Sequence, residues 1–210
     1  MPDQKQAANE HFSFGQELMR KATHMGALII PGGYFFLNLD RLNMLLIMIP
    51  ITIAMIIIDI SRLRQWLFWR KFASKIITPL IRKHEIDGDF TGATYILLSV
   101  CLTVALFSKP IAIAALCFII VGDTMAAIVG YRFGRHKIWR GKSIEGSLAC
   151  LAGSVIVAVF LPDLSWAVKI SGAALATVIE AIPFGIDDNV TVPILSGLGM
   201  TILNQSLMNF

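Results

Sequence analysis

Residues 110–131 read PIAIAALCFIIVGDTMAAIVGY, an apolar run that carries a single acid, Asp123, towards its end. The hydrocarbon core of a bilayer is about 30 Å thick and takes roughly 20 apolar residues per helical crossing. A carboxylate inside such a helix is costly unless it is paired, hydrated or bound to a cation. We therefore expect a membrane helix whose Asp123 faces the bundle interior or a water-filled cavity.

Six more apolar runs surround this one, at about Met25–Leu39, Leu42–Ile60, Gly92–Phe107, Gly146–Leu161, Trp166–Ile182 and Val190–Leu207. The chain has 210 residues, of which 56% are hydrophobic and 15% charged. Its mean hydropathy of +0.70 exceeds that of ordinary soluble domains. These features predict an all-α, polytopic transmembrane helix bundle of about seven spans. In the first run, Pro31-Gly32-Gly33 also allows a broken or re-entrant helix.

The expected organisation is a single integral membrane domain over residues 1–210. Residues 15–60 would hold the first two spans, residues 61–91 a cytoplasmic interfacial segment, and residues 92–210 the spans with the candidate motifs. No removable signal peptide is expected, because the first 14 residues are polar. Three cysteines, Cys101, Cys117 and Cys150, lie inside apolar runs without metal-site spacing, so they are interpreted as packing residues.

The positions of Lys and Arg predict the orientation of the chain. With the N terminus in the cytoplasm, only Arg41, Lys109 and Lys169 of the 18 basic residues fall on or towards the other side. The formal charge of +4 is therefore assigned to topology and anionic lipid, and no nucleic acid partner is expected. Between the second and third runs, Arg62–Arg82 alternates charged with aromatic residues, as in an amphipathic helix lying in the headgroup layer. This helix would anchor the chain, or alternatively form a gate for lipid entry.

Two neighbouring strings carry the first candidate chemistry, GDTMAAIVGYRFG at 122–134 and KSIEGS at 142–147. Small residues at Gly122, Ala126, Gly130 and Gly134 recur every four positions, which allows a second helix to approach closely. Lys142 offers a positive charge for a phosphate. Ser143, Ser147 and the free amides at the start of the following helix can donate hydrogen bonds to phosphate oxygens.

A second acidic group lies in EAIPFGIDDNVTVP, residues 180–193, on the same expected cytoplasmic side. Adjacent carboxylates with an amide oxygen form a hard donor set that suits magnesium. The competing interpretation is a solvated turn in which Asn189 caps a helix. Two further clusters precede apolar runs, Glu17, Arg20, Lys21 and His24 before the first, and Arg82, Glu85 and Asp87 before the third. Ordinary positive flanking of membrane helices explains the first cluster equally well.

These strings, in this order, resemble the CTP-dependent polyprenol kinase family, which contains dolichol kinase, phytol kinase and fungal-type diacylglycerol kinase. The looser strings ELMRKATHMG and HEIDGDFTGATY add to the resemblance. It implies CTP as phosphoryl donor, Mg²⁺ or another divalent metal, and a membrane lipid alcohol as acceptor. It also implies a long N-terminal membrane region in dolichol kinase that this chain lacks, so the chain looks closer to the compact phytol-kinase-like core.

Carried onto this sequence, the resemblance places ten residues in the site: Asp123, Lys142, Ser143, Glu145, Gly146, Ser147, Glu180, Asp187, Asp188 and Asn189. Our hypothesis is that Asp123 or Glu85 accepts the proton of the lipid hydroxyl and that Lys142 binds the triphosphate. The expected metal ligands are Asp123, Glu180, Asp187 and Asp188. The expected nucleotide-binding residues are Lys21, His24, Thr124, Lys142, Ser143, Glu145, Gly146, Ser147 and Asn189. Two alternatives stay open, a CTP-dependent phosphatidate cytidylyltransferase and a non-enzymatic lipid or ion transporter.

Overall fold

The computed structural model describes residues 21–66, 69, 88–139, 141–161, 163–182 and 185–209. Within these ranges the chain forms helices and no strand: α2 (Ile29–Phe36), α3 (Arg41–Leu63), α6 (Gly92–Leu106), α7 (Lys109–Phe133), α8 (Ile144–Phe160), α9 (Trp166–Ala181) and α10 (Asp188–Met208). Each predicted apolar run coincides with one of these helices to within a few residues at each end, which confirms the all-helical fold.

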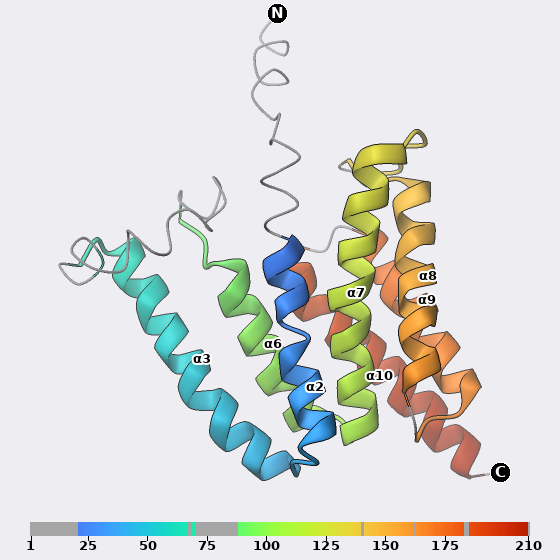
Figure 1. The fold of residues 1–210 in the computed structure, drawn as a ribbon, viewed down its shortest axis with the longest axis horizontal. Coiled ribbons are helices and arrows are strands. Elements are labelled where there is room, and N and C mark those ends of the chain that lie inside the picture. The colour runs from blue at the N-terminus through green and yellow to red at the C-terminus, as the bar shows by residue number, and fades with distance from the viewer. Residues whose placement is uncertain are drawn as a thin grey trace, which may run out of the picture.

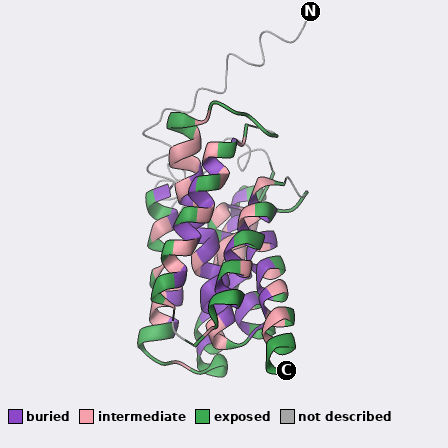
Figure 2. Cartoon of the chain, turned by 90° about the vertical axis from the view of Figure 1, so that its right-hand side faces the viewer, coloured by how far each residue is buried: buried purple, intermediate pink, exposed green. Residues whose placement is uncertain are grey.

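Helix α7 lies at the centre of the bundle. It packs against α8, α9, α10, α2 and α6, while α3 stands at one edge and contacts α6 (Figure 1). Nearly every residue of α7 from Ile111 to Ile120 is buried, so the bundle encloses this half of the helix on all sides. Buried residues line the bundle axis and exposed ones cover its outside and ends (Figure 2).

Three helices, α3, α7 and α10, are long and apolar enough to cross a membrane. Helices α6 and α8 are apolar but shorter. Large apolar side chains of α3, such as Leu46, Ile53 and Ile57, are about half exposed, an arrangement that lipid solvates well and water does not. The structure thus supports an integral membrane protein, and the count of seven spans remains a prediction.

The first apolar run, Met25–Leu39, is a broken helix, which is one of the two structures that the sequence allowed. Residues 21–26 are helical, a turn follows at Ala27 and Leu28, and α2 begins at Ile29. Pro31 has no N–H to donate to the Ala27 carbonyl four residues earlier, and that carbonyl instead accepts from the Ile30 N–H at 3.0 Å. The break directs the short helix that carries Lys21 and His24 separately from α2, and both side chains are buried.

Helices α7 and α8 approach each other closely through the small residues that the sequence identified. A Cβ on Gly130 would lie 3.3 Å from Ser143 Oγ and 3.6 Å from Gly146 Cα. A Cβ on Gly122 would lie 2.8 Å from Cys150 Sγ, further along the same interface. The four-residue spacing therefore marks a real helix contact, which also brings the start of α8 beside Asp123 of α7.

Most of the predicted interfacial helix, Arg62–Arg82, lies outside the described residues. At its beginning, however, α3 continues to Leu63, so Arg62 belongs to that helix. Arg62 is buried, with its Nε 3.2 Å from Asp59 Oδ1, and it donates to the Asp89 carbonyl.

Candidate phosphate-binding and acid site

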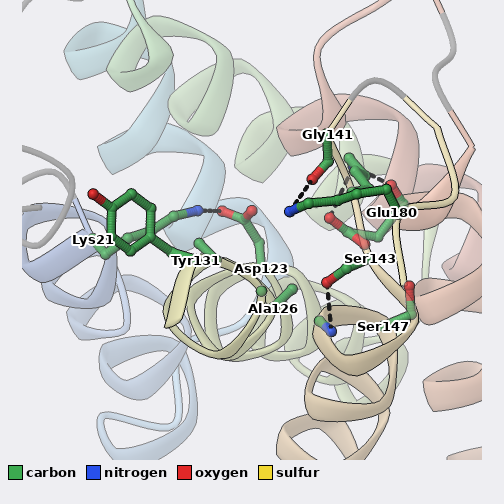
Figure 3. Close-up of a pocket in the computed structure, with 13 residues that line it drawn as sticks. Lys21, Asp123, Ala126, Tyr131, Gly141, Ser143, Ser147 and Glu180 are labelled. Carbon is green, nitrogen blue, oxygen red and sulfur yellow. Dashed lines mark hydrogen bonds and ion pairs between the residues drawn. The ribbon is translucent and has the colours of Figure 1, made fainter. Parts of the chain in front are cut away.

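A cavity of about 410 Å³ lies at the end of the bundle where α7 finishes and α8 begins (Figure 3). Its walls come from segments that are far apart in the sequence. The residues that line it are Lys21, Asp123, Ala126, Ala127, Gly130, Tyr131, Lys137, Gly141, Lys142, Ser143, Gly146, Ser147 and Glu180. Seven of the residues expected in the site from sequence, Lys21 among them, therefore meet around one space large enough for a small ligand.

Asp123 stands between the two sides of this cavity. Its carboxylate accepts a hydrogen bond from the buried Lys21 ammonium, and His24 Nε2 lies 3.6 Å from the same oxygen. Lys21 and Tyr131 lie on one side of Asp123, and Ser147 and Glu180 lie on the other (Figure 3). The intramembrane acid is thus paired and faces the cavity, as expected from the cost of burying a lone carboxylate.

The loop between α7 and α8 folds into a short hairpin. The Ile138 N–H donates to the Lys142 carbonyl at 2.9 Å, and the Lys142 N–H donates to the Trp139 carbonyl at 2.8 Å. Gly141 adopts φ +85°, a left-handed conformation that favours glycine. Glu145 tethers the hairpin, because its carboxylate lies 2.7 Å from His136 Nδ1. Glu145 therefore fixes the hairpin from outside the cavity and does not line it.

Lys142 of this hairpin joins three elements. Its ammonium lies 2.8 Å from Glu180 Oε1 at the end of α9 and 2.9 Å from Asp188 Oδ2 at the start of α10, and it also donates to the Glu180 carbonyl. Burial lowers the pKa of the Lys142 ammonium, but the two carboxylates outweigh this effect and hold the pKa above its ordinary value. Lys142 is thus a cation at all physiological pH values.

The start of α8 offers hydrogen-bond donors to the cavity. Ser143 is the N-cap of the helix, and its Oγ accepts from the Gly146 N–H at 3.2 Å. One turn later, Ser147 Oγ is buried and has no hydrogen-bond partner within the described chain. A buried hydroxyl without a partner is costly, so Ser147 is suited to donate to a ligand in the cavity.

The start of α10 is organised by Asp187. Its carboxylate accepts from the Asn189 backbone N–H at 2.9 Å and from the Asn189 side-chain amide at 2.7 Å. Asp187 is therefore the N-cap, the role that the competing sequence interpretation gave to Asn189. Both side chains satisfy each other, and neither lines the cavity.

Other expected site residues lie elsewhere. Thr124 is buried in α7 and donates to the Ile120 carbonyl at 2.7 Å, and Glu85 is outside the described residues. Across the described part of the chain, no group of three or more His, Cys, Asp or Glu side chains is arranged to hold a metal ion. Asp123 and Glu180 nonetheless line the same cavity, and Asp188 shares the Lys142 ammonium with Glu180.

Sequence reasoning missed two polar side chains of the cavity and one buried polar network. Lys137 and Tyr131 line the cavity. The signal that could have identified Lys137 is its position beside Lys142 in the same glycine-containing loop. In the network, the fully buried Asp59 accepts from Thr91 Oγ1 at 2.9 Å and Thr94 Oγ1 at 2.6 Å. This network ties α3 to the start of α6.

Comparison with known proteins adds a chemical context to this geometry. An uncharacterised protein of Rickettsia prowazekii is 29% identical over 92% of this chain and 96% of its own length. CTP-dependent diacylglycerol kinase 1 of Saccharomyces cerevisiae is 28% identical over 88% of this chain and 72% of its own length. The chloroplastic farnesol kinase of Arabidopsis thaliana is 30% identical over 51% of this chain and 41% of its own length. No family model and no solved structure matches the chain.

Proposed function

We propose that this protein is a membrane lipid-alcohol kinase that transfers the γ-phosphoryl group of CTP to an isoprenoid alcohol or to diacylglycerol. The observation that carries the proposal is a single cavity, at the end of an apolar bundle, where Asp123, Lys142, Ser147 and Glu180 converge. A water-soluble nucleotide and a lipid hydroxyl can meet only at such an edge of the bilayer. The names of the similar kinases support both the donor and the class of acceptor.

The charges around the cavity fit a triphosphate. Lys21, Lys137 and Lys142 all line it, and Ser143 and Ser147 add hydroxyl groups at the start of α8. Phosphoryl transfer depends chiefly on positioning and on neutralising the phosphate oxygens, which these groups are placed to do. Lys142 and the α8 hydroxyls would hold the phosphates, while Asp123 would accept the proton of the attacking alcohol. The cavity is proposed to open to the cytoplasm.

A divalent metal fits the same site. Glu180 and Asp188 present oxygens to one common cation, the Lys142 ammonium, and Asp123 lies nearby. Mg²⁺ in nucleotide sites is held by one or two carboxylates with waters and substrate phosphates, so a cage of three carboxylates is not needed. A bound Mg²⁺ would neutralise charge on the transferring phosphoryl group.

The test uses two labels on the nucleotide. Purified protein is incubated with Mg²⁺, CTP and a panel of phytol, geranylgeraniol, longer polyprenols, diacylglycerol and phosphatidate. Label from the γ position of CTP should enter the organic phase with one of the alcohols, and CDP should be the other product. Label from the α position entering phosphatidate with release of pyrophosphate would instead identify a cytidylyltransferase. No transfer of either label to any acceptor would reject both enzymes.

A further inference from the structure

We infer that Lys142 is an internal competitor of the metal ion: its ammonium occupies the cation position between Glu180 and Asp188 and is displaced into the cavity when a divalent metal binds there. The inference rests on the proposed function only in taking a divalent metal as the incoming ion. It assigns Lys142 a second position and couples metal binding to the supply of a phosphate-binding charge.

The first support is the position of the ammonium. Lys142 Nζ lies 2.8 Å from Glu180 Oε1 and 2.9 Å from Asp188 Oδ2, so one cation already bridges the two carboxylates. A small divalent ion that uses the same oxygens would occupy the same space, and repulsion between the two cations would oppose joint occupancy. Lysine and metal therefore exclude each other at this place.

The second support is the burial of Glu180. Only 5% of this residue is exposed, and a buried carboxylate without a cation is strongly unfavourable. The negative charges of Asp123 and Asp188 act on it as well. Lys142 is the positive partner of the buried Glu180 carboxylate in this structure, before a metal arrives.

The third support is that Lys142 has somewhere to go. The backbone of Lys142 is held in the hairpin by hydrogen bonds to Ile138 and Trp139, so its attachment point is fixed. Its side chain already lines the cavity shared with Ser143 and Ser147. Rotation of the side chain alone would carry the ammonium from the carboxylates towards phosphates bound at the start of α8.

The experiment measures metal binding to the purified full chain without nucleotide or lipid, using Mn²⁺ and its electron paramagnetic resonance signal. Lys142→Met should bind Mn²⁺ about tenfold more tightly than the wild type, because the competitor is gone. Lys137→Met is the matched control, since Lys137 lies on the same hairpin and lines the same cavity but donates, within the described residues, only to the Gly141 carbonyl, at 3.4 Å. This control should change Mn²⁺ affinity much less. Equal or weaker Mn²⁺ binding by Lys142→Met overturns the inference.

A second measurement uses the wild-type protein and so does not depend on the folding of a variant. Lysines are acetylated with and without Mg²⁺, again without nucleotide, and the modified sites are quantified by mass spectrometry. Mg²⁺ should increase modification of Lys142 and leave Lys137 unchanged. Unchanged or reduced modification of Lys142 overturns the inference. Because neither measurement involves phosphoryl transfer, a protein that shows both effects yet phosphorylates no alcohol would reject the proposed function alone.

Discussion

Asp123 is the residue on which the proposed chemistry of the cavity depends most directly. It lies between Lys21 on one side and Glu180 on the other (Figure 3), and it is only 21% exposed. A carboxylate in this position can accept a proton from a hydroxyl group that enters from the lipid side. Asparagine has almost the same shape but cannot accept that proton. Replacing Asp123 with asparagine therefore removes the proposed proton transfer while keeping the packing of the side chain.

Asp123→Asn should therefore reduce kcat for alcohol phosphorylation by about 100-fold or more, the usual contribution of a general base. The measurement is transfer of γ-label from CTP to the preferred alcohol, with membrane insertion checked by fractionation. Asp163→Asn provides the control, because Asp163 is exposed in the loop between α8 and α9 and its φ of +64° suits asparagine equally well. Wild-type turnover in Asp123→Asn would remove this residue from the mechanism.

Ser147 is informative because its buried hydroxyl has no partner within the described chain. Removing an unsatisfied hydroxyl costs the fold little, whereas removing a hydrogen bond to a phosphate weakens binding. Ser147→Ala should leave the unfolding midpoint unchanged and raise the KM for CTP about fivefold, the equivalent of about 1 kcal/mol.

Ser154 gives the comparison that this prediction needs. Its hydroxyl is also buried without a partner in the described chain, but it lies two turns further along α8 and does not line the cavity. Ser154→Ala should change neither quantity. If both variants raise the KM for CTP equally, the effect reports general packing of α8 and not a contact with nucleotide.

At the scale of helices, the contact between α7 and α8 sets the shape of the cavity. A Cβ on Gly146 would lie 3.0 Å from the Ala126 carbonyl oxygen and 3.2 Å from Ser143 Oγ. The carbonyl is part of the α7 backbone and cannot move aside as a flexible side chain would. The two helices must separate slightly to accept even one methyl group.

Gly146→Ala should therefore lower the free energy of unfolding by about 1–3 kcal/mol, as overpacking usually does. Gly33→Ala in α2 is the control, because nothing lies within 4 Å of its added Cβ and alanine favours a helix by about 0.5–1 kcal/mol. Unfolding in detergent micelles titrated with SDS measures both. Equal stability of the two variants would show that the close approach at Gly146 does not contribute to the fold.

The helices themselves could be predicted from the sequence because their signals are local. The run Gly92–Phe107 became α6, Gly92–Leu106, and the spacing of Gly122 and Gly130 predicted a close helix contact, which α8 makes in the structure. The pairing of charges could not be predicted in the same way. Lys21 with Asp123 and Lys142 with Asp188 are separated by 102 and 46 positions, so only packing of the whole bundle brings them together.

Asp59, an acid inside an apolar run, also has hydrogen-bond partners that the sequence could not identify. In the folded chain it is fully buried and bonded to Arg62, Thr91 and Thr94. Arg62 is a neighbour three positions along the same helix, but Thr91 and Thr94 are 32 and 35 positions away. An acid in a membrane helix thus predicts a polar partner, but the partner and the choice between structure and chemistry come from the fold.

At the scale of the whole molecule, the hairpin between α7 and α8 lies at one end of the bundle, and the loop between α8 and α9 lies at the other (Figure 1). The cavity lies at the hairpin end, because Lys137, Gly141 and Lys142 of the hairpin line it. The distribution of basic residues predicts that the first end faces the cytoplasm. Helix α8 is a short crossing, because its 17 residues span about 26 Å, slightly less than a typical hydrocarbon core. The proposed kinase needs α8 to cross and α9 to return, because Glu180 at the end of α9 pairs with Lys142 of the hairpin.

Cysteine labelling from the two sides of the membrane tests that crossing. Arg135 on the hairpin and Asp163 after α8 are both exposed and flank this single helix. In a background without the three native cysteines, Arg135→Cys should react with a membrane-impermeant maleimide only after the cells are permeabilised. Asp163→Cys should react in intact cells. If both positions react from the same side, α8 does not cross, and the alternating topology that places the cavity at the cytoplasmic face is wrong.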